Sequence, residues 1–213
     1  MMPDNKIEKT SVNYFEDEKD WRRRPKNIKI QGEQIYYLFD YYPGGHIPPN
    51  EFLKTANRNI KALKSDAPSR SRAVEWLARE LSKRAPIDLG WYWSYVPSSD
   101  PKSRFTGARS VAQIMSARNI TSPKPKILER KKIILTKEEQ ADGTIRKINR
   151  SIEEHQRTLG LFDNRSLKGM KIVLLDDVIT NGSTMIACRN VLLKAGVKDV
   201  IMIGLGLTLK NRA

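Results

Sequence analysis

Cysteine and histidine are scarce in this sequence, and their scarcity excludes several kinds of site. The 213 residues contain one cysteine, Cys188, and two histidines, His46 and His155. A disulfide framework within the chain needs at least two cysteines, and a zinc site built from cysteines or several histidines needs more ligands than these. Disulfide-stabilised folds and such zinc sites are therefore excluded.

Long apolar runs are also missing. No run approaches the 18 residues that a transmembrane helix needs, and the first 26 residues are charged throughout, without the apolar stretch of a signal peptide. We therefore expect a soluble protein of a reducing cytoplasm, with no membrane partner.

Acidic residues are few relative to basic ones. The chain has 39 lysines and arginines against 24 aspartates and glutamates, a formal net charge of +15. Such an excess favours an anionic partner, which could be a phosphorylated small molecule, a nucleic acid or an acidic protein. The basic residues gather in two segments: Arg22, Arg23, Arg24, Lys26 and Lys29, and then Lys124, Lys126, Arg130, Lys131 and Lys132.

The apolar pattern predicts alternating helices and strands. Helical spacing begins after Asn50, and a second helix is predicted from Ser69 or Ser71, either of which could cap it, to Pro86. A strand at 91–96 follows, and 124–135 is typical of a strand with a basic flank. Between them a helix is predicted that carries Ala108, Val111, Ala112, Ile114 and Met115. Residues 33–42 could form a strand or a short buried helix.

The segment 171–209 gives the clearest prediction of fold. Residues 172–175 are all apolar, which is typical of a strand buried on both faces. A turn, a helix ended by Gly196 and a second apolar strand follow, and this order predicts a βαβ unit. We therefore expect an α/β fold with a mostly parallel sheet flanked by helices.

Two other regions differ in composition from this α/β domain, which we assign to residues 51–213. Residues 1–50 are predicted to be an N-terminal extension that forms an arm or a hood, and its first 30 residues are polar. Residues 136–160 have few large apolar side chains and many charges, so we expect a mobile lid with some helix.

A candidate site follows the buried strand at 171–177. Asp176 and Asp177 stand at its carboxyl end, where ligands bind in open α/β sheets. Two adjacent carboxylates there repel each other and lose hydration unless ribose hydroxyls or a ligand-borne Mg²⁺ accept them. The helix that follows opens with hydroxyl and amide side chains that could hold a phosphate at its N-terminus, namely Thr180, Asn181, Gly182, Ser183 and Thr184. An ordinary capped turn is the structural alternative.

The stretch VLLDDVITNGST resembles the phosphoribosyl pyrophosphate (PRPP) signature of type I phosphoribosyltransferases, with Asn181 where a small hydroxyl residue is usual. The stretch VPSSDPKSRFTGARSVA is similar to the ComF-like branch of that family, and weaker similarity in NIKALK and GLGLTLK extends the resemblance over roughly residues 55–210. The chain lacks the four-cysteine zinc module with which ComF-like proteins often begin.

The resemblance implies a role for each group of residues. Asp176 and Asp177 would bind the ribose 2′- and 3′-hydroxyls, and residues 180–184 would surround the 5′-phosphate. Pyrophosphate would bind at Ser98, Ser99, Lys102 and Ser103. A closing lid could add Arg130, Lys131 and Lys132, which could equally be solvated. His155 could donate a proton, although a surface position is the interpretation we favour.

The implied activity is that of a glycosyltransferase. With Mg²⁺, it would transfer ribose 5-phosphate from PRPP to a nitrogen base that the sequence does not identify and release pyrophosphate; a nucleoside monophosphate would bind at the same site. The alternative is a non-catalytic accessory or regulatory protein of the same fold that acts with nucleic acid in DNA uptake or defence. Its basic surface could also bind an acidic protein, and a homodimer is compatible with the sequence.

Overall fold

The computed structural model describes residues 25–44, 46–64, 68–85, 87, 90–102, 106–118, 126–132, 137–139, 145–147, 151–163 and 166–209. Five strands form the main sheet: β1 (Lys26–Ile30), β2 (Glu33–Tyr41), β3 (Trp91–Tyr95), β8 (Lys171–Ile179) and β9 (Asp199–Thr208). Their order is β1-β2-β9-β8-β3, and every neighbouring pair except β1 and β2 is parallel. The predicted mostly parallel α/β sheet is therefore confirmed.

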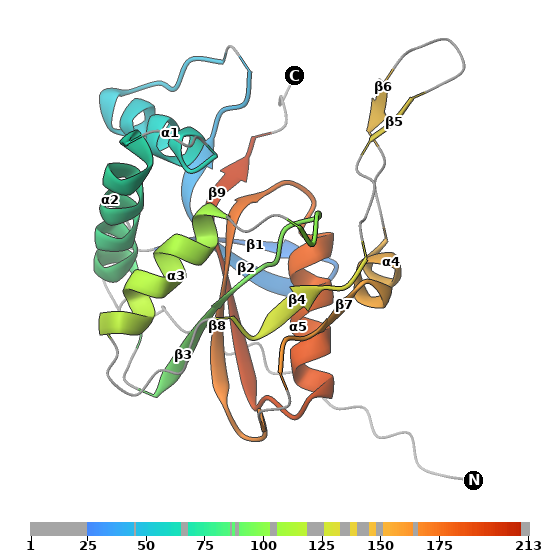
Figure 1. The fold of residues 1–213 in the computed structure, drawn as a ribbon. Helices are drawn as coiled ribbons and strands as arrows, with labels where there is room; N and C mark the ends of the chain where they lie inside the picture. Colours follow the sequence, from blue (N-terminus) through green and yellow to red (C-terminus); the bar gives the residue numbers. More distant parts are fainter. Residues whose placement is uncertain are drawn as a thin grey trace, which may run out of the picture.

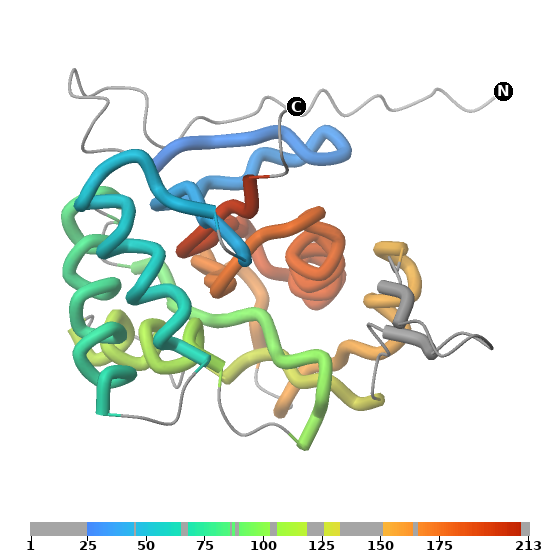
Figure 2. The backbone as a smooth tube through the Cα atoms, turned by 90° about the horizontal axis from the view of Figure 1, so that it is seen from above, coloured from blue at the N-terminus to red at the C-terminus, as the bar shows by residue number. Residues whose placement is uncertain are grey.

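Helices cover both faces of this sheet (Figures 1 and 2). One face is covered by α1 (Glu51–Ala62), α2 (Ser69–Arg84) and α3 (Gly107–Arg118), and the other by α5 (Ser183–Lys194). The helix α5 connects β8 to β9, which pair in parallel as the sequence predicted.

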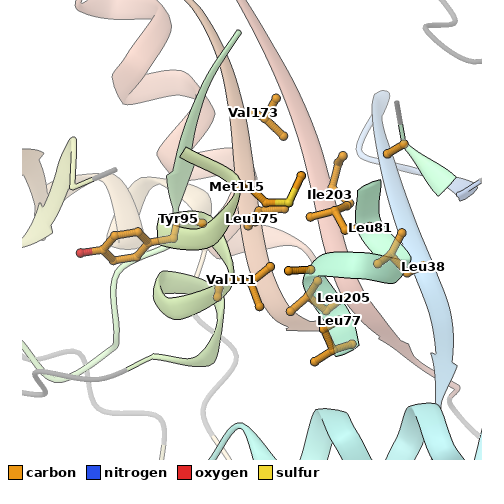
Figure 3. Close-up of a cluster of buried hydrophobic side chains, with 14 of the residues drawn as sticks. Leu38, Leu77, Leu81, Tyr95, Val111, Met115, Val173, Leu175, Ile203 and Leu205 are labelled. Atoms are coloured by element: carbon orange, nitrogen blue, oxygen red, sulfur yellow. The ribbon is translucent and has the colours of Figure 1, made fainter. Parts of the chain in front are cut away.

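The continuous apolar run in β8 fills both layers of the core. Val173 and Leu175 pack with α1, α2 and α3, and Figure 3 shows them beside side chains such as Val111. Ile172 and Leu174 pack on the other face, toward α5. Because successive side chains of a strand point to opposite faces, both sets had to be apolar.

Two helix starts differ in how they are capped. The Oδ1 of Asn50 accepts a hydrogen bond from the Leu53 N–H at 2.9 Å, so α1 begins where the spacing predicted. The predicted cap of α2 was wrong, because Pro68 precedes the helix and makes no side-chain cap. Ser69 already belongs to the first turn of α2.

The part of the chain between α3 and β8 forms two small antiparallel sheets. The strand β4 (Leu128–Arg130) pairs with β7 (Leu159–Leu161), and β5 (Lys137–Glu139) pairs with β6 (Ile145–Lys147), both antiparallel. Of the strand predicted at 124–135, the structure describes residues 126–132, and within these the strand is the three residues of β4, which lie outside the main sheet. The predicted lid thus contains a hairpin and the helix α4 (Ile152–Arg157), and its mobility stays a prediction.

The segment assigned to an N-terminal extension supplies two strands of the main sheet. Residues 33–42, left open as strand or helix, form β2, in which Tyr36 pairs with Ile203 of β9. An ion pair of 3.0 Å between Glu33 and Arg189 joins the start of β2 to α5. The predicted arm before residue 25, with Arg22, Arg23 and Arg24, lies outside the described residues.

Among the described residues, none of the helices has both the length and the apolar character that a membrane span requires.

Candidate functional site

A cavity of about 380 Å³ opens at the carboxyl ends of β3 and β8. Residues from the strand ends, the loop after β3, the start of α3, α5 and the segment between α3 and β8 line it. They are Leu63, Lys64, Val96, Pro97, Ser98, Ser99, Thr106, Gly107, Arg130, His155, Asp176, Asp177 and Thr184. The cavity thus brings together members of all the predicted groups: the acidic pair, the turn after it, the loop after β3 and the basic cluster at 130–132.

Asp177 fixes the start of α3. Its carboxylate accepts hydrogen bonds from the backbone N–H of Gly107, at 3.3 Å, and from that of Ala108. A carboxylate at a helix N-terminus satisfies N–H groups that have no partner within the helix and interacts favourably with the helix dipole. The second carboxylate of the pair is therefore already held in place by the fold.

Gly107 makes this approach possible. A Cβ atom at this position would lie 2.4 Å from the Cβ of Leu63, which is closer than two carbon atoms can pack. The glycine lets the first turn of α3 come against the end of α1, with Leu63 as the contact and Asp177 as the acceptor. The short loop and the helix start are thereby fixed beside the acidic pair.

Asp176 is the carboxylate that remains for a ligand. Its Oδ1 accepts the N–H of Asp177 at 2.8 Å, and its side chain faces the cavity. Burial, and then the negative charge of Asp177, raise the pKa of Asp176 from 3.8 to about 7. Burial also raises the pKa of Asp177, against the N–H groups of α3, which lower it. A hydroxyl donor or a cation in the cavity would relieve both carboxylates.

Arg130 is a buried cation at the same cavity. Its side chain donates to the carbonyl oxygens of Ser98, at 3.3 Å, and His155, at 3.4 Å, and to the hydroxyl of Thr158. Only 5% of Arg130 is exposed, and burial lowers its pKa from the ordinary value. In the described part of the chain, no carboxylate forms an ion pair with it. A buried guanidinium bonded only to neutral oxygens favours an anion in the cavity.

The predicted surface position of His155 was wrong. This residue of α4 is 8% exposed, and its ring nitrogens lie 3.3 and 3.5 Å from the hydroxyl oxygen of Thr184. The helix α4 packs against α5, which brings both side chains to the cavity. A sequence signal for α4 existed, because Ser151 and Glu154 have the spacing of a capping box, and both bonds of that box form.

The turn after the acidic pair leads into α5, with Gly182 at the N-cap position of the helix. Gly182 has a φ of 73°, and a Cβ there would lie 2.9 Å from the Cδ1 of Ile30, so both conformation and space require glycine. Asn181 accepts the Ser183 N–H at 3.3 Å. Thr180 and Asn181 are exposed, Ser183 is buried, and of residues 180–184 only Thr184 lines the cavity. The remainder of the turn lies beside the cavity.

The loop after β3 contributes less than predicted. Ser98 and Ser99 line the cavity, whereas Lys102 is exposed and Ser103 lies outside the described residues. Within the loop, the Asp100 N–H donates to the Ser98 hydroxyl at 3.2 Å, and the Lys102 N–H donates to Asp100 at 2.8 Å. These bonds connect residues 98, 100 and 102 of the loop to one another.

The rest of the predicted basic cluster lies apart from Arg130. Lys131 and Lys132 are exposed and do not line the cavity, so only Arg130 reaches it in this conformation. Lys64 and Thr106 also line the cavity, although the sequence indicated no binding role for them. Nothing in their local sequence marks them, because the end of α1 and the start of α3 bring them together.

The site offers few ligands to a metal ion. Within the described ranges, no group of three or more histidine, cysteine, aspartate or glutamate side chains is arranged to hold one. Two carboxylates are present, and Asp177 is already bonded to α3. These residues fit an Mg²⁺ ion that is coordinated mainly by oxygens of its ligand, with Asp176 as the available protein oxygen donor.

No protein-family model matches the chain, and no curated protein matches it significantly.

Proposed function

We propose that the chain binds PRPP together with Mg²⁺ and transfers its ribose 5-phosphate to a nitrogen base, releasing pyrophosphate. The observation that carries the proposal is the cavity that Asp176, Asp177 and the buried cation Arg130 line together with Thr184 of the first turn of α5. Such a cavity supplies acceptors for ribose hydroxyls and donors for phosphates within one small space.

Each part of the ligand would find a chemically matched group. The ribose hydroxyls would donate to the carboxylates of Asp176 and Asp177. The 5′-phosphate would accept from the first N–H groups of α5 and from Thr184, since Gly182 at the cap position places no side chain over them. The pyrophosphate would bind between Arg130 and the loop of Ser98 and Ser99.

The chemistry asked of these residues is orientation and charge stabilisation. Departure of pyrophosphate from the ribose leaves positive charge on the sugar ring and negative charge on the leaving oxygens. Asp176 and Asp177 would hold the ring in place, and Arg130, already desolvated, would stabilise the leaving group without reorganising. Mg²⁺ bound to the pyrophosphate oxygens would neutralise part of their charge.

Calorimetric titration with Mg²⁺ and PRPP tests this proposal. The wild-type chain is expected to bind, and Asp176→Asn is expected to bind at least tenfold more weakly, because an amide is a poorer acceptor for two hydroxyls. Asp199→Asn is the matched control, since Asp199 starts β9 at the opposite end of the same sheet. Equal affinity in all three proteins, or no binding by the wild type, would overturn the proposal.

Transfer is tested separately from binding. Pyrophosphate release is measured with a panel of purine and pyrimidine bases, with Asp176→Asn as the inactive control. Release with any base that depends on Asp176 supports the transferase. Tight binding without release from any base would instead support the non-catalytic alternative, in which the same cavity binds a phosphorylated ribose as a signal.

A further inference from the structure

A second hollow lies at the other end of the main sheet. It has a volume of about 540 Å³ and opens at the amino ends of β3 and β8, at the bottom of the sheet in Figure 1. We call it the lysine hollow, because three lysines line it together with other residues of these loops: Gly90, Trp91, Tyr92, Lys168, Gly169, Met170, Lys171 and Lys198. It shares no residue with the cavity at Asp176.

Backbone hydrogen bonds join the two loops that carry these lysines. The Gly169 N–H donates to the Gly196 carbonyl at 2.9 Å, and the Lys198 N–H donates to the Met170 carbonyl at 2.8 Å. A turn with a φ of 77° at Gly169 allows this pairing. The loops before β8 and before β9 are thereby held together as one surface.

The charge of the lysine hollow is unbalanced. Lys168, Lys171 and Lys198 are exposed, and none of them forms an ion pair within the described part of the chain. Lys171 lies 5.5 Å from the ring of Trp91, an aromatic contact that leaves its charge in place. Asp199 is the neighbour of Lys171 in the backbone register of β8 and β9. Its Oδ1 accepts a hydrogen bond from the Val200 N–H.

The helix dipole does not account for these three lysines. The C-terminus of α5 also lies at this end of the sheet, and Lys194 in its last turn fits the partial negative charge there. Lys168, Lys171 and Lys198 stand outside that helix, on loops and at the start of a strand. Their clustering at one opening therefore favours an external anion.

We propose that the lysine hollow binds the phosphate backbone of a nucleic acid strand. Lysine is a flexible, hydrated point charge, and lysine contacts to phosphate oxygens position a nucleic acid without reading its bases. Three such charges around one opening suit phosphates that repeat along a strand. The hollow is wider than one phosphate needs, and the net charge of +15 attracts a polyanion over a distance. This surface differs from the basic segments that the sequence indicated.

Fluorescence anisotropy with labelled oligonucleotides tests the proposal. A single strand and a duplex, each of about 20 nucleotides and in DNA and RNA forms, are titrated between about 50 and 200 mM salt. The test variant carries Lys168→Gln, Lys171→Gln and Lys198→Gln, which keep most of each side chain but remove its charge. The control carries Lys29→Gln, Lys54→Gln and Lys61→Gln, which remove the same charge from exposed positions elsewhere.

The test variant is expected to bind at least tenfold more weakly than the control, with a shallower dependence of affinity on salt because fewer phosphates are neutralised. A variant with all three lysines changed to arginine should restore binding, which shows that charge and not folding is at issue. Equal loss in test and control variants, or no wild-type binding at low salt, would overturn the proposal. So would loss that occurs only when Arg22, Arg23 and Arg24 are replaced.

Discussion

One side chain, Asp177, serves the fold and the candidate site together. Its carboxylate lies near the carboxyl end of β8, accepts two N–H groups at the start of α3 and lines the cavity. Asp176 has no such helix to support it, and burial leaves its charge poorly compensated. Removal of the two carboxylates should therefore have opposite effects. Loss of the Asp177 carboxylate should destabilise the fold, whereas loss of the Asp176 carboxylate should stabilise it.

The raised pKa of Asp176 predicts how stability depends on pH. A carboxyl whose folded pKa is about 7, against 3.8 in the ordinary state, stabilises the fold below pH 4 and loses that contribution as the pH rises toward 7. Asp176→Asn has no such proton to lose. The variant should therefore gain about 1–3 kcal/mol of unfolding free energy relative to wild type between pH 4 and pH 8.

Urea unfolding of both proteins across this pH range measures the difference, in which the other titrating groups cancel. Asp199→Asn should follow the wild type in parallel. A constant difference between wild type and Asp176→Asn at every pH would show that Asp176 is ionised normally in the free protein.

At the scale of elements, the site depends on how closely α1 and α3 approach. Gly107→Ala would place a methyl group against Leu63, so the start of α3 must move away from Asp177. We expect a loss of about 1–3 kcal/mol of unfolding free energy, together with weaker PRPP binding. Thermal or urea unfolding and calorimetry measure the two effects.

A double-mutant cycle with Leu63→Ala identifies the contact. Because the smaller side chain makes room for the new methyl group, the double variant should be more stable than the sum of the single losses predicts, by about 1 kcal/mol or more. Ser110→Ala, within the same helix, is the control and should change little. Strict additivity would mean that α3 does not rest on Leu63.

Elements with strong local signals were predictable from the sequence. Three local patterns were sufficient for this: the continuous apolar run of β8, the glycine that follows α5, and the helical spacing of apolar residues in α1 and α3. The carboxyl-end position of Asp176 followed from that pattern together with the general behaviour of parallel sheets. The residue pattern alone was therefore enough to place the acidic pair near the carboxyl ends of the parallel strands.

The remainder depends on tertiary contacts that no local pattern encodes. The burial of Arg130 results from β4 pairing with β7, and the burial of His155 results from α4 packing on α5. Of these elements, α4 lies in the segment 136–160, whose charges indicated a lid. Residues 26–41 were separated from the α/β domain by their composition, yet they complete the sheet because β2 pairs with β9. Polar composition alone therefore misplaced residues that the fold brings inside.

At the scale of the whole molecule, ligand binding should appear as added stability. A ligand that binds only the folded chain, at 100 times its dissociation constant, contributes about 2.7 kcal/mol. For a chain of this size, Mg²⁺ with PRPP should raise the melting temperature by about 5–10 °C. Differential scanning fluorimetry at several PRPP concentrations measures the shift.

Asp176→Asn should show a smaller rise at the same concentration, and the lysine-to-glutamine variant of the lysine hollow should show the full rise. The two ends of the sheet would then act as separate binding surfaces. A rise of the same size in the Asp176 variant would place the ligand elsewhere on the molecule.

The pairing of β2 with β9 also sets the order in which the molecule can assemble. Tyr36 of β2 pairs with Ile203 of β9, which is synthesised much later. One edge of β2 therefore stays unpaired while the helices and β3 are synthesised. Sheets closed by such distant partners fold slowly and expose a strand edge in the meantime. The hairpin partner β1, with Lys26 and Lys29 exposed along it, covers the other edge of β2 early and discourages pairing between nascent chains.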